Sequence, residues 1–137
     1  MTTVVSIIGD SLREINVISE DEAPSAEQGS FALRRLNQML EAWTEDDIEL
    51  GYFKQSATTA TIPIPEWSEL AVIKMLSINL APNYGASVSA ELVNTASDAY
   101  GMLLRKSIAE KQRGGNMDTM PQGEGKYRPE GRILTDV

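Results

Sequence analysis

The sequence predicts an all-α fold with a four-helix core over residues 1–114, a small β-hairpin inserted at residues 48–64 and an extended C-terminal arm over residues 115–137. Three observations lead to this prediction. Apolar residues recur at spacings of three and four in four separate segments, as in amphipathic helices. The pattern changes to alternation and β-branched residues within the insertion. The last 23 residues hold four glycines and two prolines and show no helical period.

The first two helices are predicted on either side of an acidic loop that contains Pro24. The first helix spans about Thr3 to Ile18, and the second begins after Ser25 and runs to about Glu45. Ser25 and Gln28 have the capping-box spacing, in which each side chain satisfies a backbone N–H group at the start of a helix. The apolar stripe of the first helix is Val4, Val5, Ile8, Leu12 and Ile15, and that of the second is Ala32, Leu33, Leu36, Met39, Leu40 and Trp43.

The spacing of apolar residues changes from helical to alternating over residues 48–64. Ile48, Leu50 and Tyr52 alternate with Glu49 and Gly51, and β-branched residues follow the segment Gln55-Ser56-Ala57. This pattern predicts a short two-stranded hairpin. Pro63 and Pro65 restrict its second strand to a sheet edge, so the hairpin should lean on helices or on another subunit.

The remaining two helices are predicted between proline and glycine signals. Pro65 suits the first turn of a third helix, which ends near Ala81 because Pro82 follows. Apolar residues occupy almost every face of this helix, which predicts a central helix buried on every side. The fourth helix should run from about Val88 to Arg113 after a cap at Ser87. Its apolar stripe is Leu92, Ala96, Ala99 or Tyr100, Leu103 and Ile108.

Composition excludes many functions. The chain of 137 residues has no histidine, no cysteine and a net charge of -8, which leaves no zinc finger, disulfide, thiolate nucleophile or imidazole base. We expect no metal and no cofactor, and the phosphate-binding glycine motifs are missing. No apolar run is long enough to span a membrane and no basic signal region is present, so we expect synthesis in the cytoplasm.

The acidity lies near the N-terminus. Residues 1–53 hold 11 acids and 3 bases, and the rest of the chain is nearly neutral. Because gripping a phosphate backbone requires an excess of Lys and Arg, the charge predicts no specific nucleic-acid binding.

Three groups of residues are candidates for function. Glu45, Asp46, Asp47 and Glu49 could in principle cleave a glycosidic bond or hold calcium, but the solvated end of a helix is the favoured interpretation. Trp43 lies on an apolar stripe and is predicted to pack in the core, whereas Trp67 suits packing and subunit contact equally. The arm carries Met117, Met120, Tyr127, Ile133, Leu134 and Val137, a composition that suggests ordering on a partner.

Four stretches, in order, resemble a known family. They are Ser30 to Tyr52, with Leu36, Leu40, Ala42-Trp43 and Gly51-Tyr52; Leu80-Ala81-Pro82-Asn83-Tyr84-Gly85; Ala96 to Lys106, with Tyr100, Gly101 and Leu104; and Met120-Pro121-Gln122-Gly123-Glu124-Gly125. Through them the chain resembles the head-to-tail adaptor proteins of tailed bacteriophages, specifically the tail accessory or head-completion (packaged-DNA stabilisation) protein of short-tailed phages. Residues 53–66 do not match that family.

The resemblance implies a non-enzymatic virion protein at the head–tail junction. Twelve copies would form a ring beneath the portal, link the filled head to tail proteins and help retain the DNA, which may pass through the ring. The arm would bind the portal protein, and an α-helical bundle would form the ring. The portal-binding candidates are Met120, Pro121, Tyr127, Arg128, Arg132, Ile133 and Leu134, and the candidate subunit contacts are Tyr52, Phe53 and Trp67.

Two other functions compete with this interpretation. Some adaptors of this type have been suggested to degrade peptidoglycan, so a muralytic virion enzyme is the alternative. A DNA-binding small packaging subunit is disfavoured by the charge.

Overall fold

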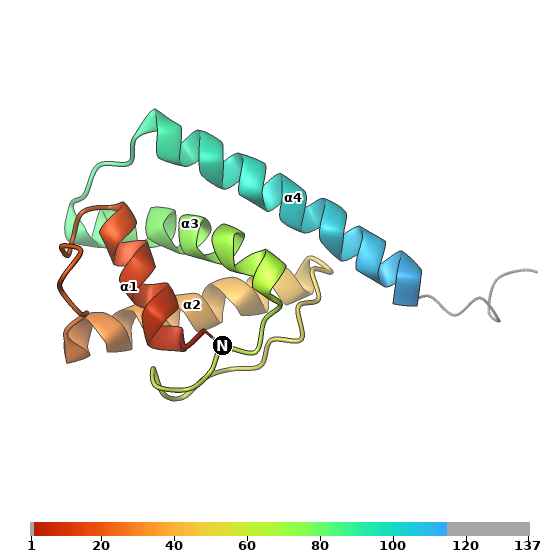
Figure 1. Cartoon of the computed structure of the whole chain (residues 1–137), viewed down its shortest axis with the longest axis horizontal. Coiled ribbons are helices and arrows are strands. Elements are labelled where there is room, and N and C mark those ends of the chain that lie inside the picture. The colour runs from red at the N-terminus through yellow and green to blue at the C-terminus, as the bar shows by residue number, and fades with distance from the viewer. Residues whose placement is uncertain (1, 115–137) are drawn as a thin grey trace, which may run out of the picture. The chain divides into compact units, whose positions relative to one another are not determined.

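The prediction of an all-α fold with four helices is confirmed. The computed structural model describes residues 2–114, except for the side chains of residues 113 and 114. Its helices are α1 (Val4–Glu14), α2 (Ala26–Glu45), α3 (Glu69–Leu80) and α4 (Ala90–Gly114), and short 3-10 turns, η1 (Glu66–Ser68) and η2 (Ala81–Tyr84), flank α3 (Figure 1). The chain forms one compact unit over Met1–Ser107, and a second unit begins at Ile108.

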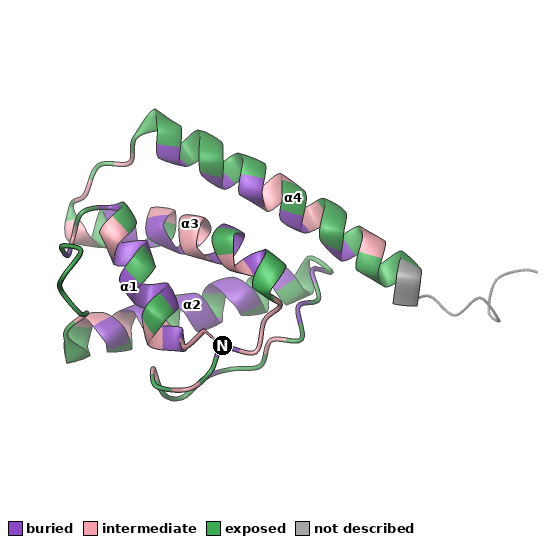
Figure 2. Cartoon of the chain, in the orientation of Figure 1, coloured by how far each residue is buried: buried purple, intermediate pink, exposed green. Residues whose placement is uncertain are grey.

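The core lies between the faces that α1, α2 and α3 turn toward one another. α1 packs chiefly on α3, and α2 contacts both. Figure 2 shows the buried positions of α4 as one stripe along that helix. The largest fully buried apolar side chains are Val4, Ile7, Ile8, Leu12, Leu36, Leu40, Val72, Leu76, Leu80 and Leu103. The helical spacing of the apolar residues therefore predicted most of the core.

The prediction of a β-hairpin at residues 48–64 was wrong. Among the described residues the structure contains no strand, and their one isolated β-bridge joins Thr61 to Thr3, near the N-terminus. The N–H groups of Val4 and Val5, which open α1 and have no partner within the helix, donate to the carbonyls of Ala60 (2.9 Å) and Thr58 (2.8 Å). The β-branched segment therefore caps a helix instead of pairing with residues 48–52.

The alternation of apolar and polar residues over residues 48–51 reflects which side chains are buried, not strand pairing. Ile48 and Leu50 are buried in the core, Glu49 and Gly51 are exposed, and Ile62 is buried as well. An extended chain places alternate side chains on opposite sides whether or not it has a strand partner, so the apolar positions were identified correctly and the pairing was not.

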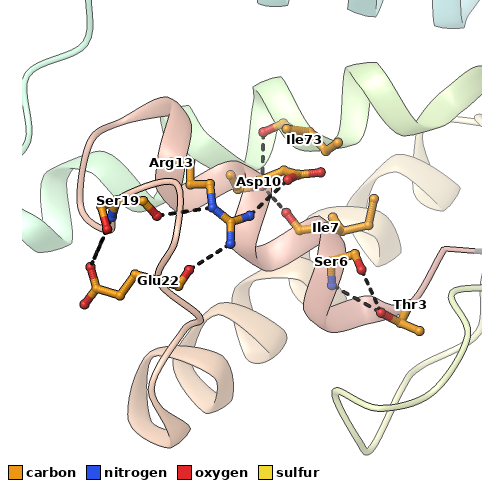
Figure 3. Close-up of polar contacts among 9 residues, drawn as sticks. Thr3, Ser6, Ile7, Asp10, Arg13, Ser19, Glu22 and Ile73 are labelled. Atoms are coloured by element: carbon orange, nitrogen blue, oxygen red, sulfur yellow. Dashed lines mark hydrogen bonds and ion pairs between the residues drawn. The ribbon is translucent and has the colours of Figure 1, made fainter.

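Arg13 fastens the connection from α1 to α2. Its guanidinium donates to the backbone carbonyls of Ser19 (3.3 Å) and Glu22 (2.8 Å), and it forms an ion pair with Asp10 at 3.2 Å. Figure 3 shows the side chain reaching from α1 across to the loop. The guanidinium of Arg13 thus links α1 to the acidic loop between the two helices.

The predicted capping box of α2 is confirmed. The Ser25 hydroxyl accepts from the Gln28 N–H (3.2 Å), and the Gln28 side chain accepts from the Ser25 N–H (2.9 Å). At α4 the predicted cap is displaced by two residues, because the hydroxyl of Ser89 instead of Ser87 accepts from the Leu92 N–H at 3.1 Å.

The prediction that the third helix is buried on every side was wrong, because one side of α3 is open to solvent. Ala71, Val72, Leu76 and Leu80 face the core, whereas the Leu70 residue is 56% exposed. A single exposed leucine of this kind is ordinary on a protein surface.

Candidate functional site

The proposed portal-binding arm lies outside the described residues. Met120, Pro121, Tyr127, Arg128, Arg132, Ile133 and Leu134 all belong to the part of the chain that the structure does not describe. Two features within the compact unit, a loop and a groove, are therefore the candidates for contacts with other proteins.

The loop of residues 50–56 is fastened to the middle of α2 by one buried side chain. The Asn37 amide donates to the Gln55 carbonyl (2.9 Å) and accepts from the Gln55 N–H (3.0 Å). The Tyr52 hydroxyl donates to the same Asn37 oxygen, and the Gln55 side chain donates to the Phe53 carbonyl (2.8 Å). Since Asn37 binds both polar groups of one backbone residue, it sets the path of the loop.

Two of the three predicted subunit contacts, Tyr52 and Phe53, lie in this loop. The Tyr52 side chain is partly buried, and this burial raises its pKa to about 12, so the phenol stays protonated and continues to donate. Phe53 is 66% exposed, the most exposed of the large apolar residues in the described part of the chain. The loop thus holds an aromatic ring outward on a backbone that is itself hydrogen-bonded.

The third predicted contact, Trp67, lies in η1 and is 36% exposed. Ser68 beside it is fully buried, and its hydroxyl donates to the Pro65 carbonyl at 2.6 Å. The partial exposure of Trp67 agrees with either packing or subunit contact.

A groove runs between α2, α3 and the first part of α4. It has a volume of about 500 Å³, and the rings of Trp43 and Tyr100 lie along it with their centroids 5.4 Å apart at a tilt of 58°. Burial raises the pKa of Tyr100, and the charge of Asp46 adds to that increase. The lining residues are Arg35, Gln38, Met39, Ala42, Trp43, Asp46, Met75, Asn79 and Tyr100.

Sequence reasoning missed this groove. Trp43 is buried, as predicted, but its partner Tyr100 is 57 positions away along the chain. The one available signal was that both aromatics stand on helical apolar stripes. Nothing in the spacing indicated that the two stripes meet beside Met75.

The carboxylates at the end of α2 are not arranged as a catalytic pair. Glu45, Asp46, Asp47 and Glu49 are all exposed, and a carboxyl that serves as general acid requires burial to stay protonated. Among residues 2–114 no group of three or more acidic side chains is placed to hold a metal ion. The interpretation as a solvated helix end agrees with this exposure.

The described helices include none that is long and apolar enough to cross a membrane.

Comparison with known sequences gives one match and one negative result. A sequence model for the P22 tail accessory factor matches residues 1–129. No curated protein sequence gives a significant match.

Proposed function

This chain belongs to the P22 tail accessory factor family, and from that membership we propose that it is a non-enzymatic adaptor at the head–tail junction of a phage virion. In this proposal twelve copies form a ring beneath the portal, connect the filled head to tail proteins and help retain the packaged DNA. The family match, which spans the helical core and most of the arm, is the observation that carries the proposal.

The arm is the proposed anchor on the portal protein. Tyr127, Ile133 and Leu134 would each fill an apolar pocket, and burying one aliphatic side chain contributes about 1.5 to 3 kcal/mol. Arg128 and Arg132 would pair with carboxylates, where exposed pairs contribute only about 0 to 1 kcal/mol. Met120 and Pro121 would begin the bound segment. The anchoring energy should therefore come chiefly from the apolar residues.

The helical core would supply the contacts between subunits. Phe53 and Trp67 leave apolar surface exposed on a small protein, and Tyr52 supports the loop that carries Phe53. Exposed aromatic residues of this kind are common at the centres of protein interfaces.

A truncation after Gly114 tests the anchor. We expect the full chain to bind the cognate portal ring in about twelve copies, a number that rests on the family resemblance, and the truncated chain to keep its helical circular dichroism but lose portal binding. Native mass measurement of each protein with and without portal gives the stoichiometry. Equally tight binding by the truncated chain would refute the anchoring role.

A peptidoglycan zymogram tests the muralytic alternative. We expect no clearing by the full chain, because the carboxylates at the end of α2 are exposed. Clearing that disappears in Asp46→Asn or Asp47→Asn would contradict the non-enzymatic proposal.

A further inference from the structure

We propose that the middle of α2 is a docking surface for a short acidic segment of another virion protein, whose carboxylates bind Arg34 and Arg35. The surface consists of Phe31, Arg34, Arg35 and Gln38, which share one side of the helix. This inference rests on the proposed adaptor function, because it states the chemistry that a neighbouring protein in the virion presents to this chain.

Two guanidinium groups lie close to one aromatic ring on this surface. The guanidinium carbons of Arg34 and Arg35 are 5.6 and 5.2 Å from the centroid of the Phe31 ring. Phe31 in turn packs edge-on against Tyr84 of η2, with the ring centroids 6.3 Å apart. Cation–π contacts of this kind hold a charged side chain near the ring, so both charges are positioned before a partner binds.

Both positive charges lack a partner at close range. Arg34 and Arg35 are exposed, and neither forms an ion pair with any residue that the structure describes. Asp46 lines the groove beside Arg35 without reaching it, and Arg35 donates one long hydrogen bond to the Gln38 side chain at 3.4 Å. A guanidinium has five N–H donors in a planar fork that matches a carboxylate. Most of these donors are therefore available to a partner.

The other charges along α2 limit the kind of partner. Glu27 and Glu41 lie seven residues before and after Arg34, which places all three on the same side of the helix at intervals of about 10 Å along its axis. Both carboxylates are exposed. Positive charge is thus confined to the middle of the surface, where Lys54 adds to it beside Arg34. A complementary segment carries two or three acids in its centre and a base toward each end.

This order of charges favours a protein segment over nucleic acid. A nucleic-acid strand carries a negative charge at every nucleotide, so a strand that followed α2 would meet Glu27 and Glu41 as well as the arginines. The net charge of -8 also repels a polyanion at long range. The partly buried ring of Phe31 offers apolar contact, which a peptide side chain can use and a phosphate cannot.

A second copy of this chain does not present the complementary order. Its two stretches richest in acids are residues 20–22 and 45–49, and neither has a Lys or Arg within seven positions on both sides. The acidic segment is therefore assigned to a different protein.

An NMR titration of the isotope-labelled full-length chain tests the surface through the side-chain Nε–H signals of Arg34 and Arg35. The matched probe is a synthetic helical peptide with adjacent Glu residues in its centre and a Lys at each end. The control peptide has the same composition, with Lys in the centre and Glu at the ends. We expect the matched peptide to bind at least about fivefold more tightly, the scale of one exposed ion pair. Equal affinities, or equal shifts at Arg105 of α4, would overturn the proposal.

Substitutions separate this surface from non-specific attraction. Arg34→Gln combined with Arg35→Gln should weaken binding of the matched peptide by about tenfold. Arg105→Gln, at another exposed arginine, is the matched control and should change the affinity by less than about twofold. Equal effects of the two changes would overturn the proposal.

Two further measurements test the other possible occupants. If a single-stranded oligonucleotide bound Arg34 and Arg35 more tightly than the matched peptide does, the surface would be assigned to phosphate and the proposal would be overturned. If the combined Arg34→Gln and Arg35→Gln change abolished self-association in sedimentation velocity, the carboxylates would belong to a second copy, which would also overturn it. We expect weaker binding of the oligonucleotide and unchanged self-association.

Failure of this surface is distinguishable from failure of the proposed function, because the peptide titration needs no portal. If neither peptide binds at Arg34 and Arg35 while the chain still forms a ring on the portal, the adaptor function stands and the docking surface is wrong. If the matched peptide binds but the wild-type chain does not bind the portal, the surface stands and the portal adaptor function is wrong.

Discussion

Replacing Asn37 with alanine should destabilise the whole fold, because Asn37 joins the loop of residues 50–56 to α2. Its side chain amide is bound to both backbone polar groups of Gln55 and to the Tyr52 hydroxyl. Asn37 and Gln55 are both buried. In Asn37→Ala the N–H and the carbonyl of Gln55 lose their partner inside the protein.

The size of the effect follows from those contacts. Each buried polar group left without a partner costs about 1 to 3 kcal/mol, which for the two Gln55 groups gives about 2 to 6 kcal/mol. Alanine offsets about 0.5 kcal/mol of this through its higher helix propensity. Asn37 also lines a surface hollow together with Glu41 and Lys54, where water can reach the freed groups. We therefore expect a loss of about 2 to 3 kcal/mol, within the range set by the unpaired-group penalty.

Urea unfolding followed by tryptophan fluorescence measures the loss, because Trp43 lies buried in the core. At about 4 °C per kcal/mol for a domain of this size, the thermal midpoint should fall by roughly 8 to 12 °C. Gln38→Ala, at the exposed neighbouring position, is the matched control and should stay within about 0.5 kcal/mol of wild type. If Asn37→Ala were as stable as this control, the reasoning about the buried amide would be refuted.

Three further predictions concern stability. Ser25→Ala should lower the unfolding free energy by about 1 kcal/mol and Ser25→Asp should retain most of it, since Asp also caps a helix; equal losses in urea unfolding would contradict the capping role. Leu36→Ala should cost about 2 to 5 kcal/mol, because Leu36 is fully buried, and a loss below 1 kcal/mol in the same assay would argue against that packing. Since the pKa of Tyr52 is raised to about 12, the unfolded chain loses this proton first and stability falls as pH rises from about 10 through 12. The urea midpoint of Tyr52→Phe should therefore fall less steeply between pH 10 and 12 than that of the wild type. An equally steep fall would contradict the raised pKa of Tyr52.

Much of the helical core was predictable because its signals are local. The capping box at Ser25 and Gln28 depends on residues three apart, and Pro82 with Gly85 marks the end of α3 through backbone geometry alone. Gly85 adopts a φ of 64°, a left-handed conformation that glycine tolerates at little cost. Local features of this kind can be predicted without knowing which helices pack against each other.

The fate of residues 48–64 was not predictable in the same way. Alternation correctly identified Ile48, Leu50 and Ile62 as buried, but strand pairing depends on which backbone groups lack partners nearby. The open N–H groups at the start of α1 donate to the segment's carbonyls, and they lie more than 50 positions away in the sequence. A long-range partner of this kind leaves no mark in a short window of sequence.

By itself, the sequence determined the all-α class, the approximate limits of the helices, the buried stripes and, through ordered short motifs, the family that the comparison then confirmed. These depend on chain-local physics: helical periodicity, capping and the conformational limits of proline and glycine. Only the tertiary structure decided that Asn37 clamps the loop below Phe53 and that Trp43 meets Tyr100 in a groove. Both result from packing between distant segments, where burial makes each polar group find a partner and each apolar face find a surface.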